Sequence, residues 1–325
     1  MTNPQRPPAT ATATATQKPL PLKNKPHPTT VYRCKTQHMK WFGGRESGDV
    51  EEGSSRGGGR GLMFGGGIVG FIGLLIYVFT GINPSQLLNQ GQGNGNGQQN
   101  TQPVSGPESR AKQFSRVVFQ GTTVVWDSLF NTMGKTYTHP VLHFYTGQVD
   151  AACGFATAAT GPFYCPADSR VYLDLSFFDE LENRFQAPGE AASAYVIAHE
   201  VGHHVQNLLG ISARVDEARN RLSEEQYNKL SVKLELQADF YAGLWAHYEA
   251  LNHHNGIVIE RADIDSALNA AHQIGDDRLQ QKYQGRVSPD SFTHGTSAQR
   301  MYWFKKGFDT GDITQGNTFV RSDLE

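Results

Sequence analysis

The pattern of apolar and polar positions divides the chain into a long segment without core-forming periodicity and a C-terminal part with it. Residues 62–80 form one run of 19 uncharged residues, LMFGGGIVGFIGLLIYVFT. A run of this length can cross the hydrocarbon core of a bilayer as one helix, and lipid tolerates its five glycines. A signal peptide or a buried core helix fits less well, because about 60 low-complexity residues precede the run and no cleavage site follows. The pattern predicts one N-terminal transmembrane helix at 62–80.

The segments around this run have compositions typical of unfolded chain. Residues 1–61 contain Thr-Ala repeats, prolines, a Gly-rich stretch and ten Lys or Arg residues, and are predicted to be a disordered basic tail. Residues 81–106 are rich in Asn, Gln and Gly and are predicted to be a flexible linker. The folded domain is therefore expected at 107–325.

Membrane orientation follows from the positive charges. After the apolar run the next basic residue is Arg110, so the positive-inside rule predicts a cytoplasmic N-terminus and an extracytoplasmic domain, in a single-pass membrane protein. Gly66 and Gly70 form a GxxxG pattern, which allows a homodimer through this helix.

Within 107–325 the periodicity is mainly helical. Residues 113–130 predict a helix, residues 171–175 alternate in the manner of a strand, and almost everything after Pro188 predicts helices. The formal net charge is only −2, which gives no indication of a nucleic-acid partner. Cys153 and Cys165 lie in an apolar segment; they form a disulfide if the domain is extracytoplasmic and are two buried thiols if it is not.

The motif that carries chemistry is His199-Glu200-Val201-Gly202-His203. Pro188-Gly189-Glu190 predicts a helix start and Gly210 its end, with apolar residues at three- and four-residue steps between them. His199 and His203 are one helical turn apart, so both imidazoles project from the same face. This arrangement is typical of two zinc ligands, with Glu200 placed to act as general base on a water molecule. His204 faces another direction and is expected to be a hydrogen-bonded histidine.

A third ligand has to come from another part of the chain. The metzincin continuation is absent, because Leu209 stands where a histidine is required. Ser223 and Gln226 form a capping box that predicts a second helix, and Glu235 and Asp239 lie four residues apart on it within an apolar run. Glu235 is the expected ligand, and Asp239 is expected to hold the outer N–H of a zinc-bound histidine. An ordinary solvated acidic pair is the alternative.

A last group of residues surrounds His294. Thr296 or Ser297 predicts a helix N-cap, with the helix running through Phe304 and ending at Gly307. His294 lies just before this helix, and is the candidate for stabilising the oxyanion of a peptide hydrolysis, with Arg300 in reserve. A turn histidine and a structural arginine are the alternatives.

These motifs resemble the bacterial family of putative neutral zinc metallopeptidases, which are single-pass zincin-type proteins. The resemblance extends from Met39 onward, and its motifs are WFGGR at 41–45, ACGF at 152–155, GPFYCP at 161–166, VYLD at 171–174, HEVGHHVQ at 199–206, ELQAD at 235–239 and HGTSAQR at 294–300. It implies a zincin-like α+β fold, predominantly helical with a small sheet, in which residues 171–175 line the substrate cleft. It also implies that Cys153 and Cys165 form a bridge.

We therefore expect a membrane-anchored zinc (Zn2+) metallopeptidase that hydrolyses a peptide or protein substrate. His199, His203 and Glu235 are its predicted metal ligands, and Glu200 and His294 its predicted catalytic residues. The alternative is a catalytically silent binding protein that keeps the zincin scaffold, although a closed structural zinc site needs no general base.

Overall fold

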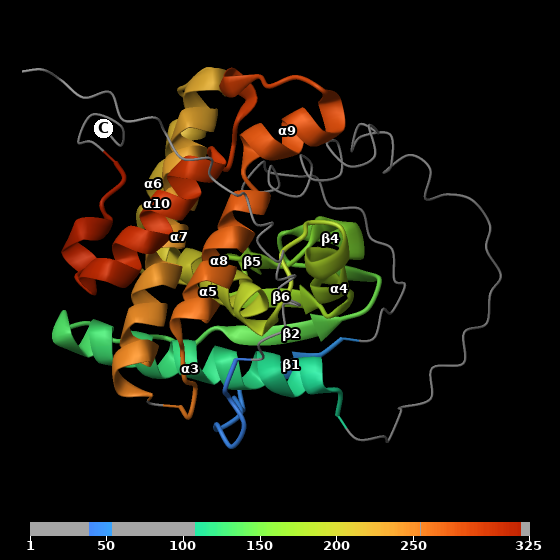
Figure 1. Cartoon of the computed structure of the whole chain (residues 1–325). Helices are drawn as coiled ribbons and strands as arrows, with labels where there is room; N and C mark the ends of the chain where they lie inside the picture. Colours follow the sequence, from blue (N-terminus) through green and yellow to red (C-terminus); the bar gives the residue numbers. More distant parts are fainter. Residues whose placement is uncertain (1–38, 54–107, 254, 320–325) are drawn as a thin grey trace, which may run out of the picture. The chain divides into compact units, whose positions relative to one another are not determined.

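The computed structural model describes residues 39–53, 108–253 and 255–319 (Figure 1), and all of them belong to one compact unit. The predicted transmembrane helix at 62–80, its Gly66 and Gly70, and the linker at 81–106 lie outside the described residues. Among the helices that are described, none has both the length and the apolar character needed to cross a membrane.

Most of the described residues are helical. The α-helices are α3 (Arg110–Thr132), α4 (Ser176–Asn183), α5 (Glu190–Leu208), α6 (Ile211–Arg219), α7 (Glu224–Asn252), α8 (Arg261–Gln273), α9 (Asp276–Gln284) and α10 (Ser297–Thr310). The described part of the chain also contains the short 3-10 helices η1 (Ala158–Thr160), η2 (Pro289–Ser291) and η3 (Ile313–Gly316). The α+β class with predominant helix is confirmed.

Two small sheets complete the fold of the described residues. The first has the strand order β1-β2-β6-β5, from β1 (Val50–Glu52), β2 (Val141–Tyr145), β6 (Arg170–Asp174) and β5 (Phe163–Cys165). Its first three strands are parallel, and β5 is antiparallel to β6. The second is the hairpin of β3 (Gln148–Ala151) and β4 (Gly154–Thr157). The strand expected at 171–175 is present as β6, but it is an interior strand, so the edge of the sheet beside α5 is β5.

Residues 39–53 belong to this domain and not to the disordered tail in which the sequence analysis placed them. Val50 to Glu52 pair in parallel with Leu142 to Phe144 of β2. Met39 and Trp41 are each only 2% exposed and lie in the main hydrophobic core. The assignment of residues 39–53 to the tail was wrong because these residues acquire their apolar environment only through partners far along the chain.

Helices α7 and α10 lie side by side (Figure 1), and glycines set their separation. A Cβ on Gly307 would be 2.1 Å from the carbonyl oxygen of Phe240, and one on Gly243 would be 2.0 Å from that of Phe304. Gly307 is therefore a position of close helix approach. The predicted helix end at Gly307 was wrong for this reason: α10 continues to Thr310 and ends at Gly311, which has a φ of +60°.

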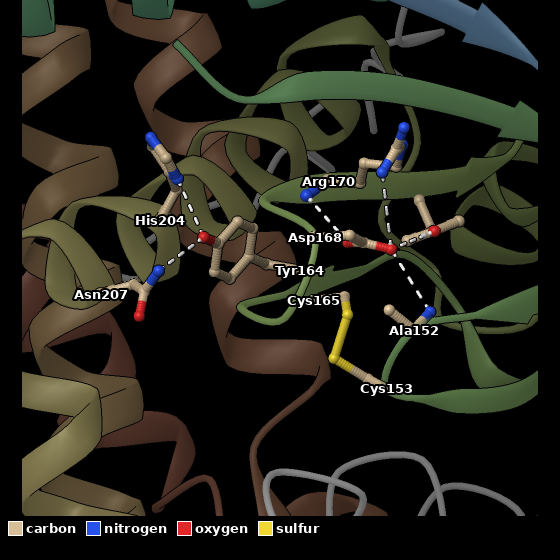
Figure 2. Close-up of a disulfide and its surroundings, with 9 residues drawn as sticks. Ala152, Cys153, Tyr164, Cys165, Asp168, Arg170, His204 and Asn207 are labelled. Carbon is tan, nitrogen blue, oxygen red and sulfur yellow. Dashed lines mark hydrogen bonds and ion pairs between the residues drawn. A yellow bond between two sulfur atoms is a disulfide. The ribbon is translucent and has the colours of Figure 1, made fainter. Parts of the chain in front are cut away.

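The hairpin is joined to the edge of the larger sheet by a disulfide between Cys153 and Cys165 (Figure 2). Asp168, close by in sequence, accepts hydrogen bonds from the Tyr172 hydroxyl at 2.7 Å and from the backbone N–H of Ala152 at 3.3 Å. These contacts connect the hairpin to the turn between β5 and β6.

Candidate metal centre

Three side chains from two helices converge where α5 packs on α7. His199 and His203 point their Nε2 atoms at the carboxylate of Glu235, at 3.1 and 3.4 Å, respectively. One donor atom from each of the three residues lies within 4.8 Å of the others, and these residues form the group of potential metal ligands identified among the described residues. The structure thus brings together the three residues that the sequence analysis selected as ligands.

Gly202 allows the two helices to approach closely enough for this convergence. A Cβ at Gly202 would be 3.0 Å from the carbonyl oxygen of Ala238 and 3.3 Å from Cβ of Tyr241. Gly202 lies between the two histidines on α5, and Ala238 lies between Glu235 and Asp239 on α7. The small residue inside the motif therefore brings the two ligand-bearing helix faces together.

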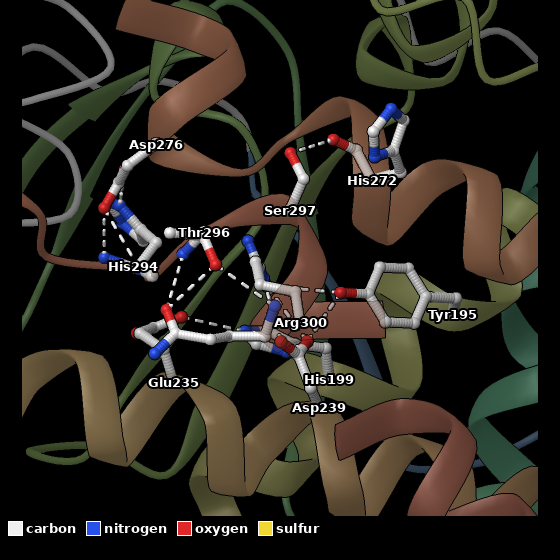
Figure 3. Close-up of polar contacts among 12 residues, drawn as sticks. Tyr195, His199, Glu235, Asp239, His272, Asp276, His294, Thr296, Ser297 and Arg300 are labelled. Atoms are coloured by element: carbon white, nitrogen blue, oxygen red, sulfur yellow. Dashed lines mark hydrogen bonds and ion pairs between the residues drawn. The ribbon is translucent and has the colours of Figure 1, made fainter. Parts of the chain in front are cut away.

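Asp239 holds the first histidine from behind (Figure 3). Its Oδ1 is 2.9 Å from Nδ1 of His199 and accepts a hydrogen bond from the Tyr195 hydroxyl at 2.5 Å. Arg300 donates to both carboxylate oxygens of Asp239, from Nε at 2.8 Å and from Nη2 at 3.0 Å. Arg300 is only 2% exposed, and its buried positive charge is balanced by the carboxylate of Asp239. This placement gives Arg300 a supporting position behind the ligands and does not favour its reserve role as the oxyanion donor.

The second histidine has a partner of its own, which the sequence analysis missed. Nδ1 of His203 is 2.9 Å from Oε1 of Gln206, and the amide of Gln206 donates to the Leu234 carbonyl at 2.7 Å and to Gln237 at 3.1 Å. Because a glutamine oxygen can only accept, Nδ1 of His203 carries the proton and its Nε2 is the atom available to a metal ion. The position of Gln206, three residues after His203 on the same helix face, is the signal that could have identified it.

The electrostatics of the cluster match its geometry. Burial alone would lower the pKa of His199, but Asp239 and Glu235 raise it to about 9. Burial alone would raise the pKa of Glu235, yet His203 and His199 hold it well below its usual value. Asp239 also keeps a lowered pKa, against its burial, because of Arg300 and His199. The two carboxylates are therefore ionised, as ligand and ligand support require.

Glu200 lies beside the three ligands and under the edge strand. It is 4% exposed, and burial raises its pKa, whereas His203, His199 and a hydrogen bond from the backbone of Tyr164 on β5 lower it. The Tyr164 hydroxyl donates a hydrogen bond to Nδ1 of His204 at 2.9 Å and accepts one from the side-chain amide of Asn207 at 3.1 Å (Figure 2). The edge strand is thus fixed along α5, with Glu200 beneath it.

His204 is not part of the ligand cluster. Its Nε2 donates to the carbonyl oxygen of Thr138 at 2.7 Å, so its Nδ1 accepts from Tyr164. Burial lowers its pKa to about 4, which keeps the ring neutral. His204 is a hydrogen-bonded histidine, as expected, and it connects α5 to the strand above.

His294 lines the same cavity as His199 and Glu200. Its ring is held by Asp276, with Nδ1 at 2.9 Å from Oδ1, and Asp276 Oδ2 accepts the backbone N–H groups of Thr293, His294 and Gly295 at 2.7 to 3.1 Å (Figure 3). Asp276 is 2% exposed and fixes both the turn and the imidazole. Asp276 was not predicted as a site residue, because Asp276-Asp277 at a helix start has the appearance of ordinary N-terminal acids.

The three ligand side chains fit a zinc ion. Ligand atoms at about 2.05 Å from a tetrahedral zinc are about 3.3 Å apart, and the separations of 3.1 Å from His199 Nε2 to Oε2 of Glu235 and of 3.4 Å from His203 Nε2 to its Oε1 are close to that value. Both histidines have their Nδ1 atoms engaged with acceptors, so Nε2 is the atom that faces the centre and can bind an ion once it carries no proton. Two histidine nitrogens and one carboxylate form the kind of three-residue donor set that catalytic zinc sites use.

Comparison with known proteins also points to a zinc metallopeptidase family. The chain is 47% identical to "Uncharacterized protein YpfJ" of Escherichia coli K12 over 297 residues, which cover 87% of this chain and all of that protein. It is 41% identical to "Uncharacterized protein Mb2605" of Mycobacterium bovis over 216 residues, covering 64% of this chain and 71% of the other. No solved structure matches it. A family model matches residues 39–319, and the chain belongs to the family described as "Putative neutral zinc metallopeptidase".

Proposed function

We propose that this protein is a zinc-dependent peptidase with a gluzincin-like site on a zincin-like α+β fold. The observation that carries the proposal is the convergence of His199, His203 and Glu235 beside Glu200, under the edge strand β5. His199, His203 and Glu235 would hold the ion. A bound zinc would supply Lewis acidity, polarising the scissile carbonyl and lowering the pKa of a coordinated water to about 7.

Glu200 moves the proton in the proposed reaction. Its carboxylate accepts a proton from the attacking water and then gives it to the leaving amine nitrogen. Glu200 is buried beside the two histidines, and this burial raises the pKa of its carboxyl group. Asp239, supported by Arg300 and Tyr195, orients His199 throughout.

His294 is the proposed donor to the developing oxyanion. Support comes from its place in the cavity with Glu200 and from the ring orientation that Asp276 imposes. Replacing His294 with alanine is expected to lower kcat by about 10²- to 10³-fold, while zinc content stays unchanged. An unchanged kcat would remove His294 from the mechanism.

The test of the proposed function uses the full chain, because residues 39–53 are part of the core. Bound zinc and hydrolysis of a broad peptide library are measured for the native protein and for Glu200→Gln. We expect stoichiometric zinc in both and activity only in the native protein. Zinc in both with activity in neither favours the silent scaffold protein, and activity retained in Glu200→Gln contradicts the mechanism.

The extracytoplasmic location of the domain is also a proposal. It is supported by the Cys153–Cys165 disulfide, because such bonds persist in oxidising compartments. Since residues 39–53 share one core with residues 108–319, both segments have to be on the same side of any membrane. A reporter placed at the C-terminus and one placed before Met39 are expected to give the same sidedness if the chain folds in this way.

A further inference from the structure

A cavity opens directly beside the proposed catalytic groups. It measures about 530 Å3, counting the part that is open to solvent, and its lining includes His199, Glu200 and His294. The cavity is therefore continuous with the place where the scissile bond has to lie.

Most of the remaining lining is apolar and comes from several parts of the fold. Five bulky side chains, from α4, the segment after it, α5, the end of α8 and α9, form the walls: Phe177, Phe185, Val196, Ile274 and Leu279. Each of these elements packs in the main hydrophobic core. The walls are therefore anchored by the core.

The charged groups of the lining are already engaged. Arg300 is held by both oxygens of Asp239 and by Tyr195, and Glu200 is the proposed base. A charged substrate side chain entering the cavity would lose its hydration without gaining a counter-ion from these groups. A bulky apolar side chain would instead exchange water for contact with the five apolar walls.

We propose that this cavity is the specificity pocket for one residue flanking the scissile bond, and that it selects large aliphatic or aromatic side chains. The inference rests on the proposed function and adds the substrate class to it. Val196 contributes to the lining from α5, three residues before His199, and Leu279 contributes from α9.

The experiment maps cleavage sites in a random peptide library with the full-length, zinc-loaded protein. We expect enrichment of Phe, Leu and similar residues at one position next to the cleaved bond, by about tenfold or more over Ala, Asp or Lys. Val196→Phe, which fills the pocket, is expected to reduce this preference about tenfold in favour of small residues, and Leu279→Ala to admit larger rings. Leu181→Ala is the matched control: Leu181 is equally buried on α4 but is absent from the lining.

A binding measurement separates this inference from the proposed function. Zinc-loaded Glu200→Gln protein is titrated with paired peptides that differ only in having Phe or Asp at the selected position. If no cleavage site has been found, arrays of such Phe and Asp pairs are used instead. About tenfold tighter binding of the Phe peptides, lost in Val196→Phe, supports the pocket even if the native protein cleaves nothing. Cleavage without an apolar preference, or a preference unaffected by Val196→Phe and Leu279→Ala, overturns the pocket and leaves the peptidase standing. If the protein neither cleaves the library nor binds the Phe peptides selectively, both the pocket and the peptidase function are overturned.

Discussion

Glu249 makes the stability of this domain depend on pH in a way that one substitution can isolate. The side chain is fully buried on α7, and Gly121 of α3 approaches it so closely that an added Cβ would be 2.6 Å from its Oε1. Among the described residues neither of its carboxylate oxygens has a hydrogen-bond partner of normal geometry. Burial raises its pKa from 4.5 to about 7, although the nearby indole of Trp245 lowers it slightly.

The sign and size of the effect follow from this shift. Below pH 4.5 the group is protonated in both states. Between 4.5 and 7 the unfolded chain ionises and the folded protein does not, so the free energy of unfolding falls as pH rises. The total loss is about 3 kcal/mol by neutral pH, at about 1.4 kcal/mol per pKa unit, and it does not grow further above pH 7.

Glu249→Gln keeps the shape and removes the titration. Urea unfolding is measured from pH 4.5 to 8.5 with a chelator present, so that metal binding does not contribute. The difference between native protein and variant is expected to change by about 3 kcal/mol towards the variant across this range, since all other groups cancel. The exposed Glu217→Gln is the control. A difference that is constant with pH would refute the assignment of a neutral, buried Glu249.

Three other predictions concern the supports of the fold and the site. Trp41→Ala is expected to destabilise the domain by about 3–5 kcal/mol in urea unfolding, while the neighbouring Phe42→Ala, at an exposed site, has little effect; equal effects would contradict the packing of residues 39–53. Arg300→Lys keeps the charge but loses the two-point contact with Asp239, so zinc affinity measured by chelator competition should fall about 10- to 100-fold, whereas Arg286→Lys at an exposed site should leave it unchanged. Cys153→Ser with Cys165→Ser should remove up to about 3 kcal/mol of stability, read from thermal unfolding with and without reductant; a native protein that is insensitive to reductant would argue against the bridge.

Local patterns in the sequence were sufficient to predict the helices that carry the ligands. The capping box of Ser223 and Gln226 and the left-handed Gly210 after α5 are present where they were expected. The four-residue spacing in α5 placed His199 and His203 on one face of that helix, and the same spacing in α7 placed Glu235 and Asp239 on one face of that helix. These signals are local, because helix geometry relates residues three and four apart without reference to the rest of the chain.

The supports of the site depended on information that is not local. Tyr195, Gln206 and Asp276 are ordinary helix residues in the sequence, and only their packing against α7, α10 and the His294 turn gives them partners. Short strands such as β1 and β5, of three residues each, carry too little alternation to be recognised, and their register depends on strands far away in the chain. Gly307 shows the same limit, since a glycine at a helix end and one at a helix contact have the same sequence pattern.

For the N-terminal segment, the charge distribution and the packing of the fold lead to incompatible predictions. The charge distribution around residues 62–80 predicts that the chain before them is cytoplasmic and the chain after them is not. The fold pairs Val50–Glu52 with β2 and buries Trp41 in the same core as α5, with Lys112 of α3 in an ion pair with Glu52. A chain that crosses a membrane once between Gly53 and Glu108 cannot form these contacts, because no strand pairs through a bilayer. The charge rule concerns insertion, whereas the packing concerns the folded domain, so a destabilising effect of Trp41→Ala would decide for the packing and require another relation between residues 62–80 and the membrane.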